Sequence, residues 1–377
     1  MTALLVEGER AAAAAAEALS IRGDARRRQE LVGLLAEGSA IYQGLGTQQA
    51  ERLRGFILSS FEHVGLPADA APFVVEELAT GFDPYVLAAA ARALRGASEI
   101  SEGVTKSLAR AVNRVIASDD FVQFDTWPPN DPLAAKTLAS VDVLRSVALL
   151  GARAASLMPM LSQIARGSGG FSAETAGAIK AALAAVSSMH SGESCCNAND
   201  DRAAEASARI PLADLSDLAL QDQDGRGLSF GAFFIGRPSV VTFFYTRCMN
   251  PEKCSLTITK LARLQKLLKS QGLENAINLA AITYDPAFDL PERLHAYGAG
   301  RGFLFSERAK LIRTQGPLQP LQDHLDLGVG FGPSTVNRHR IELFLMDARC
   351  ELRAWFVRVP WNEEAVMPRL LSMISED

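Results

Sequence analysis

The 377-residue chain has little cysteine, little histidine and little net charge. Five cysteines are too few to staple a scaffold of this length, and in a reducing compartment paired thiols are more often catalytic or metal-binding than structural. A net charge of −5 gives no reason to expect a nucleic acid or an anionic membrane as a partner. We find no run of about 18 apolar residues that could span a bilayer.

The start of the chain does not read as a targeting signal. It is rich in alanine but carries Glu7, Glu9 and Arg10, whereas a secretory signal has a basic start and an uninterrupted apolar core. We therefore expect a cytoplasmic protein without a membrane segment.

The first half of the chain is predicted to be helical. Helical periodicity recurs over residues 48–64, 70–80, 84–96, 103–117, 132–150, 153–166 and 173–188. Two stretches, 72–96 and 143–161, each read as an antiparallel helix pair similar to a degenerate HEAT repeat, a unit that stacks because it cannot bury its apolar face alone. We expect residues 1–188 to form a HEAT-like domain that either binds a protein partner or simply packs on its neighbour.

The second half of the chain is predicted to be α/β. Residues 189–207 read as a polar linker, in which His190, Cys195 and Cys196 either clip a metal or, as we favour, belong to a flexible tether. Residues 208–377 form the second domain. Its strands are expected at 240–245, 277–283, 303–305, 341–346 and 352–359, and its helices at 255–271, 291–297, 318–325 and 363–374. This order is that of a thioredoxin-like fold.

Two cysteines mark the junction between a predicted strand and helix. An apolar, β-branched and aromatic run leads to Cys248, and Cys254 opens the amphipathic pattern 256–268. The helix macrodipole is expected to lower the pKa of Cys254. Six helical steps of about 100° would not bring both sulfurs to one face, so residues 249–253 are expected to bulge as a loop. The polar residues between the thiols argue against two inert core cysteines.

His339 differs from His63, His190, His295 and His324 in its position. It follows a glycine- and proline-containing loop, 328–333, which we expect to be flexible, and precedes the predicted strand 341–346. In a thioredoxin-like layout, the loop before that strand lies beside the cysteine turn. Two thiolates and a neutral imidazole suit Cu(I), and with a further ligand Cu(II), whereas zinc usually takes a fourth ligand.

Residues from about 210 to 375 resemble the Sco/SenC family, thioredoxin-fold proteins implicated in copper delivery to cytochrome oxidase and in thiol redox work. The resemblance rests on Leu212–Leu215 with Asp224-Gly225, on the strand and first cysteine in 241–248, on the Asp-Pro element in 283–292, and on a histidine eight residues before Asp347. It implies that Cys248, Cys254 and His339 are copper ligands, with Asp285 in a supporting role. The family typically has three residues between its cysteines and is usually membrane-anchored and extracytoplasmic; this chain has five and shows neither signal.

Three functions follow from these features. The first is copper binding and transfer through Cys248, Cys254 and His339, with a partner protein docked on the helical domain. The second is thiol–disulfide or thiol peroxidase chemistry by Cys248 and Cys254, one attacking and the other resolving. The third is a non-enzymatic scaffold in which replacing both cysteines has no effect. Cys350, in a predicted hairpin turn, is expected to be an exposed free thiol without a role.

Overall fold

The computed structural model describes residues 11–376 except 12, 19, 22–23, 119, 128–134, 168–169, 188–214 and 359–360. Two compact units divide the chain. One, the helical unit, holds the described residues up to 187 together with Gly330–Arg338; the other, the α/β unit, holds the described residues of 215–329 and 339–376. The predicted linker 189–207, with His190, Cys195 and Cys196, lies outside the described residues.

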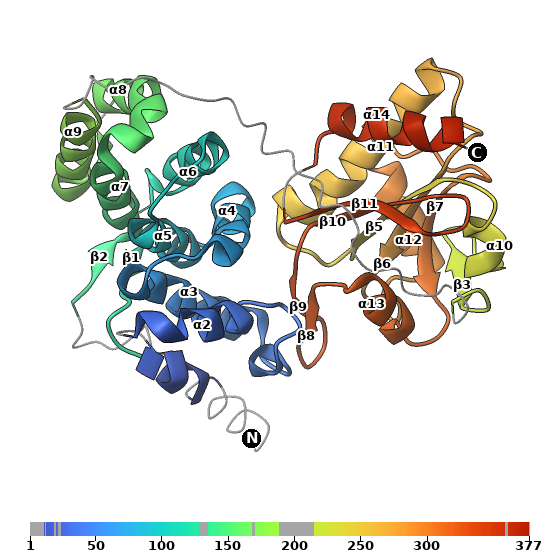
Figure 1. Ribbon diagram of the computed structural model, residues 1–377, viewed down its shortest axis with the longest axis horizontal. Helices are drawn as coiled ribbons and strands as arrows, with labels where there is room; N and C mark the ends of the chain where they lie inside the picture. The colour runs from blue at the N-terminus through green and yellow to red at the C-terminus, as the bar shows by residue number, and fades with distance from the viewer. Residues whose placement is uncertain are drawn as a thin grey trace. The chain divides into compact units, whose positions relative to one another are not determined.

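Most of the predicted helices are present in the helical unit, although two begin several residues later than expected and a further helix, Arg28–Leu34, is not predicted. The helices are α2 (Arg28–Leu34), α3 (Thr47–Val64), α4 (Ala71–Thr80), α5 (Pro84–Ala93), α6 (Glu102–Val115), α7 (Ala139–Leu150), α8 (Met158–Arg166) and α9 (Ala173–Ser187) (Figure 1). The start of α5 shows why they begin there: Asp83 accepts from the backbone N–H groups of Tyr85 and Val86, and Pro84 takes the first helical position.

Helices two apart in the chain pack against each other in this unit. Helix α3 packs on α5, α5 on α7 and α7 on α9, while α4 packs on α6. Their apolar faces form one core of buried aliphatic and aromatic side chains. Stacked helix pairs bury their faces in this way, but the HEAT-like repeat itself stays a prediction. Residues 137–138, which we expected to be helical, instead form β2 (Thr137–Leu138), which pairs with β1 (Phe121–Val122), and α7 begins at Ala139.

One helical stretch bears on the expected absence of membrane segments. Among the described residues, Ala139–Arg166 is long and apolar enough, by length and composition, to cross a membrane, and 33% of its most apolar window is buried. Core helices of soluble proteins meet the same criteria, so the stretch is one weak candidate.

The α/β unit is built on a mixed seven-stranded sheet. The strands are β3 (Ala219–Asp222), β4 (Gly227–Ser229), β5 (Ser239–Phe244), β6 (Asn278–Thr283), β7 (Ala309–Thr314), β10 (Glu342–Met346) and β11 (Leu352–Val357), in the spatial order β11-β10-β5-β6-β7-β3-β4. Strands β5, β6 and β7 are parallel, and β10 pairs antiparallel with β5. Every residue of β5 and β6 is buried, which is why both read as continuous apolar runs.

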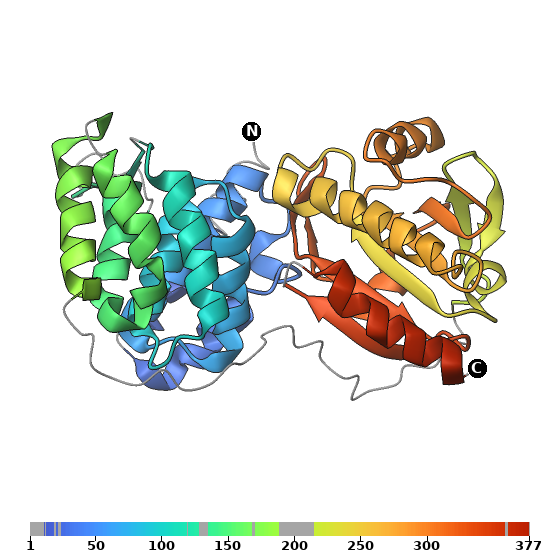
Figure 2. The ribbon, with the colours of Figure 1, turned by 90° about the horizontal axis from the view of Figure 1, so that it is seen from above.

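The helices of this unit are α10 (Phe230–Phe234), α11 (Leu256–Ser270), α12 (Pro291–Ala299), α13 (Gln319–Leu325) and α14 (Glu363–Glu376). Helices α11 and α14 run alongside each other (Figure 2), and α12 packs on β7 and β3. The element order is thioredoxin-like, as predicted.

Two predictions for this half of the chain need correction. Residues 303–305 form no strand; the strand in this region is β7, which begins at Ala309. The stretch expected to be a loop at 328–333 instead contains β8 (Val329–Phe331), which pairs with β9 (Val336–His339) as a separate two-stranded ribbon.

Candidate metal centre

The cysteine turn, residues 245–255, connects β5 to α11. The amide of Cys248 donates to the carbonyl of Tyr245 at 3.3 Å, which closes the first part of the turn. Asn250 then caps a single π-helical turn, Pro251–Ser255, by accepting from the amide of Glu252 at 2.9 Å. Cys254 lies within this π-helical turn, and α11 follows without a break. The five residues between the cysteines thus include the extended Asn250 and the first part of the π-helical turn, a feature often found at functional sites.

Asp289, which we did not single out from the sequence, fixes the start of the cysteine turn. Its buried carboxylate accepts from the amide of Thr246 at 3.0 Å and from the hydroxyls of Thr246 and Thr283. Burial raises the pKa of Asp289, and these hydrogen bonds oppose the rise. The only sequence signal is a second acidic residue shortly after Asp285.

Asp285 lies beside the site but not among the donor atoms. Its carboxylate accepts from Nε of Arg247 at 3.0 Å, and the Arg247 guanidinium lies 4.1 Å from the ring centre of Phe288. Asp285 therefore restrains the residue next to Cys248. A supporting role for it stays a prediction.

His339 ends strand β9 and is 7% exposed. Its Nδ1 lies 3.1 Å from the carbonyl oxygen of Arg340, which can only accept, so Nδ1 carries a proton and Nε2 is the ring nitrogen that faces the sulfurs. The Tyr245 ring meets the imidazole edge-to-face, with ring centres 5.4 Å apart, and Lys253 Nζ donates to the His339 carbonyl at 2.8 Å. These contacts fix the orientation of the His339 imidazole.

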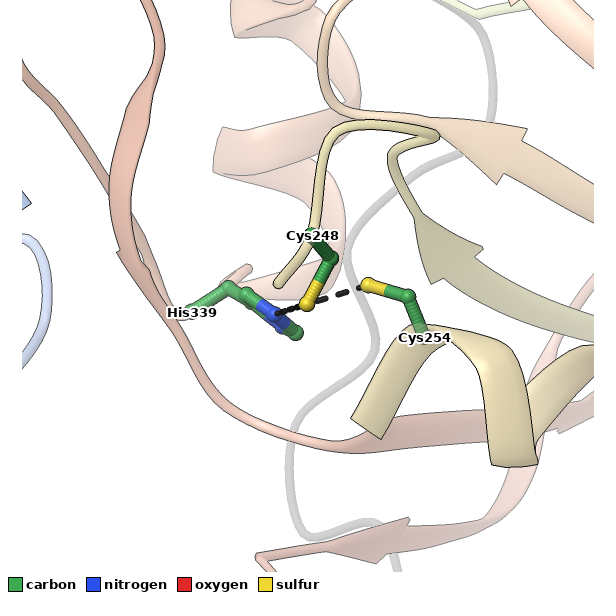
Figure 3. Close-up of side chains that lie close together, drawn as sticks. All are labelled: Cys248, Cys254 and His339. Carbon is green, nitrogen blue, oxygen red and sulfur yellow. Dashed lines mark hydrogen bonds between the residues drawn. The ribbon is translucent and has the colours of Figure 1, made fainter. Parts of the chain in front are cut away.

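The two sulfurs and the imidazole meet in space. His339 Nε2 lies 3.5 Å from Cys248 Sγ and 3.5 Å from Cys254 Sγ, and the three donor atoms lie within 4.8 Å of one another (Figure 3). Metal–sulfur and metal–nitrogen bonds are roughly 2.0–2.3 Å, so two donors on one ion lie at most about 4.6 Å apart. His339 Nε2 lies within this limit of each sulfur; that the three side chains share an ion stays a prediction.

The two thiols differ in charge. Hydrogen bonding by Cys254, aided by His339, holds the pKa of the Cys248 thiol far below its usual range, against the effect of burial. Burial, together with the neighbouring Cys248 sulfur, raises the pKa of the Cys254 thiol well above its usual value. The expectation that the helix would lower the pKa of Cys254 is wrong, because this side chain is 1% exposed and desolvation outweighs the macrodipole. The site thus pairs a thiolate with a thiol.

Cys350 is a buried thiol remote from this chemistry. It is 3% exposed in the turn between β10 and β11, and burial raises its pKa to about 12. The expectation of an exposed thiol is wrong because the turn folds the side chain inward. Among the described residues, no other group of three or more histidine, cysteine or acidic side chains converges as closely as the metal-centre triad.

Comparison with known proteins gives one partial family match. Residues 215–305 match the model of the family described as SCO1/SenC. The matched range includes both cysteines of the turn and ends before His339. No curated protein matches the chain.

Several solved structures share part of the fold. A SCO1/SenC family lipoprotein from Bacillus anthracis is 20% identical, covering 42% of this chain and 95% of its own, with a TM-score of 0.36. ScoI from Bradyrhizobium japonicum, solved with copper bound, is 20% identical over 41% and 96%, with a TM-score of 0.34. The bacterioferritin comigratory protein of Xanthomonas campestris, studied for alkyl peroxide reduction, is 16% identical over 45% and 99%, also at 0.34. Likenesses of this size decide nothing about activity.

Proposed function

We propose that this protein binds copper through Cys248, Cys254 and His339 and passes it to a partner protein. The convergence of two sulfurs and one imidazole nitrogen within 4.8 Å carries the proposal. The match of residues 215–305 to the SCO1/SenC family supports it for the cysteine turn.

The donor set favours copper over zinc. Thiolate sulfur and imidazole nitrogen are soft ligands that hold Cu(I) at low coordination number, whereas structural zinc takes four protein ligands. Among the described residues, no fourth cysteine, histidine or acidic side chain joins the group. Cu(II) would need a further ligand, which water could supply.

Transfer requires that another protein can reach the ion. Cys248 is half-buried whereas Cys254 is buried, and Met249, next to Cys248, is 84% exposed. Cys248 is therefore the ligand that an incoming thiol would displace or join first. We propose that the partner docks on the helical unit, as stacked helices offer extended surfaces for proteins.

A Cu(I) titration of reduced protein, in competition with a chelator, tests the proposal. We expect one tightly held copper per chain and a loss on the order of a hundredfold or more in Cys248→Ser, beyond the 10–100-fold that supporting residues cost. His339→Ala should weaken binding as well, while Cys350→Ser and His324→Ala, matched controls for a lost thiol and a lost imidazole, should bind as the wild type. Equal binding by the wild type and His339→Ala, or none in either, would discredit the three-ligand site.

A second function, thiol-based peroxide or disulfide reduction, is favoured by the asymmetry of the thiols. The Cys248 thiolate would attack the peroxide oxygen and release an alcohol, leaving a sulfenic acid. Cys254 would then attack that sulfur, releasing water and leaving a disulfide that an external thiol reduces. Peroxide turnover measured with a thiol reductant separates the functions: a redox protein keeps most of its turnover in His339→Ala, whereas a copper protein shows little turnover in either form.

A further inference from the structure

The histidine ligand stands at the end of a segment that belongs to the helical unit. We call Gly330–Arg338 the arm; the residues on either side of it, Val329 and His339, belong to the α/β unit. The arm contains most of the β8–β9 ribbon, and its turn is closed by the amide of Gly332 donating to the carbonyl of Thr335 at 2.8 Å. His339 follows Arg338 directly in the chain, so contacts that fix the position of the arm also restrain the backbone of His339.

The backbone of the arm lies against the backbone of the helical unit. The amide of Gly44 donates to the carbonyl of Phe331 at 3.0 Å. A Cβ at Gly330 would stand 2.6 Å from the carbonyl oxygen of Glu37, and one at Gly332 would stand 2.7 Å from that of Leu45. These two glycines are therefore required by close approach, which gives the glycine-rich stretch a role other than flexibility.

Asn337 fastens the returning strand of the arm. Its side-chain Nδ2 donates to the carbonyl of Tyr42 at 2.7 Å and to the carbonyl of Leu45 at 2.8 Å. Asn337 is 4% exposed, and both of its acceptors belong to fully buried residues that precede α3. One amide thus uses both of its N–H groups on the helical unit, two residues before His339.

Arg338 joins a buried ionic cluster of the helical unit. Its guanidinium contacts Glu77 Oε1 at 2.6 Å, and the same oxygen accepts from Nε of Arg54 at 2.7 Å. Arg54 also pairs with Glu37 at 3.1 Å. All four side chains are almost entirely buried, so each charge depends on the others for its compensation. The residue next to the histidine is therefore held by an interaction that is costly to break.

We propose that the helical unit positions the imidazole of His339 by holding the arm, with Asn337 and Arg338 as positioning residues and Glu77 as the anchor. The proposal rests on the proposed function for its consequence: the nitrogen ligand of the copper site is under the control of the helical unit, while the two sulfur ligands are not. A partner that loosens the arm would release the imidazole and leave the metal on two sulfurs.

The test compares two anchor variants of the full-length protein, Glu77→Gln and Asn337→Ala, with His339→Ala and a matched control. The control is Glu62→Gln, because Glu62 is a half-buried carboxylate of the helical unit that also pairs with two arginines, Arg92 and Arg95, neither of which lies in the arm. Copper affinity and the nitrogen coupling in the paramagnetic resonance spectrum of the Cu(II) form are measured. We expect both anchor variants to lose 10–100-fold in affinity and to weaken the nitrogen coupling, the range found for supporting groups of metal ligands.

The outcomes separate this proposal from the copper function itself. Wild-type spectra and affinity in both anchor variants, with loss in His339→Ala, would overturn the positioning role and keep the copper site; an equal loss in Glu62→Gln would also overturn it. Should Glu77→Gln fail to fold, Asn337→Ala decides. If the wild type binds no copper, histidine-labelled metal-free protein is examined by nuclear magnetic resonance, with His339 assigned by its absence in His339→Ala. A shifted or broadened His339 ring signal in Asn337→Ala, but not in Glu62→Gln, upholds the positioning role, and an unchanged signal refutes it.

Discussion

The two stretches that meet at the candidate metal centre are held in different ways. The cysteine turn is shaped by groups close to it in the chain: the Asn250 cap, the π-helical turn after it, and Asp289 some forty residues on. The segment leading to His339 is held by Asn337 and Arg338, whose partners Tyr42 and Glu77 lie more than 250 residues earlier. The residues that shape the cysteine turn thus belong to the α/β unit, whereas the segment leading to His339 is held by residues of the helical unit.

The cysteine turn and the segment leading to His339 can therefore respond differently to a change in the helical unit. The turn that carries both thiols is shaped by hydrogen bonds to Asn250 and Asp289, which belong to the α/β unit. The imidazole is attached to a segment whose anchorage can be changed from outside the α/β unit. In the copper site that we propose, the two sulfurs would hold the ion and the position of the imidazole would set the affinity.

The largest expected effect concerns the anchorage of the histidine segment. Arg54→Leu leaves the carboxylates of Glu37 and Glu77 without their central cation, so we expect a loss of about 3–5 kcal/mol in the free energy of unfolding. Urea unfolding measures this loss. Arg26→Leu, in an exposed ion pair with Asp24, serves as the control and should leave the free energy unchanged. A loss as small as that of the control would mean that the cluster does not hold the arm.

The next largest expected effect is a pH dependence of the free energy of unfolding, which arises from Cys248 and not from Cys254. The pKa of Cys248 is lowered by hydrogen bonding from Cys254 and His339, while an unfolded thiol titrates near 8.5, roughly its ordinary value. Below that pH the unfolded chain binds one proton more than the folded one. The stability due to the thiolate is therefore complete above about pH 8.5 and declines as the pH falls toward the folded pKa, by up to about 1.4 kcal/mol per unit.

Unfolding of metal-free, reduced protein between about pH 5 and 8 measures this slope. Cys248→Ser should flatten it, and Cys350→Ser should not, because burial raises the pKa of Cys350 to about 12 and keeps it protonated throughout. Equal slopes in the wild type and Cys248→Ser would show that the thiolate is absent.

The smallest effect concerns the local construction of the cysteine turn. Asn250→Ala removes the acceptor for the amide of Glu252 and should cost about 1 kcal/mol of stability. Asn250→Asp keeps an acceptor at the same place and should cost little. Chemical unfolding of both variants gives the comparison. A similar loss in both would assign the effect to something other than the cap.

The sequence predicts correctly those elements that depend on residues close together in the chain. The apolar run of β5, the amphipathic pattern of α11 and the Asn250-Pro251 start of the turn predicted the strand, the helix and the bulge between the cysteines. The order of elements then placed the segment before β10 beside the turn, which is why the meeting of His339 with both sulfurs could be foreseen.

The features that escaped prediction depend on contacts distant in sequence. The sequence does not predict strand β7, because Lys310 interrupts its apolar run. Lys310 can be buried because Asp222 pairs with it at 2.8 Å. Asn337 and Arg338 look like loop residues until their acceptors in the helical unit are known. The pKa of Cys254 was misjudged because burial, which outweighs the helix dipole, cannot be read from a motif.

The hydrogen bond from the His339 ring to the Arg340 carbonyl has a consequence for the proton inventory. Because Nδ1 is occupied by the Arg340 carbonyl, Nε2 is the ring nitrogen left to face the two sulfurs. Cys248 has given up its proton before any ion arrives, and Cys254 has kept its own. An ion held by both sulfurs, as we propose, would therefore have to displace the proton of Cys254, and its capture would become weaker as the pH falls.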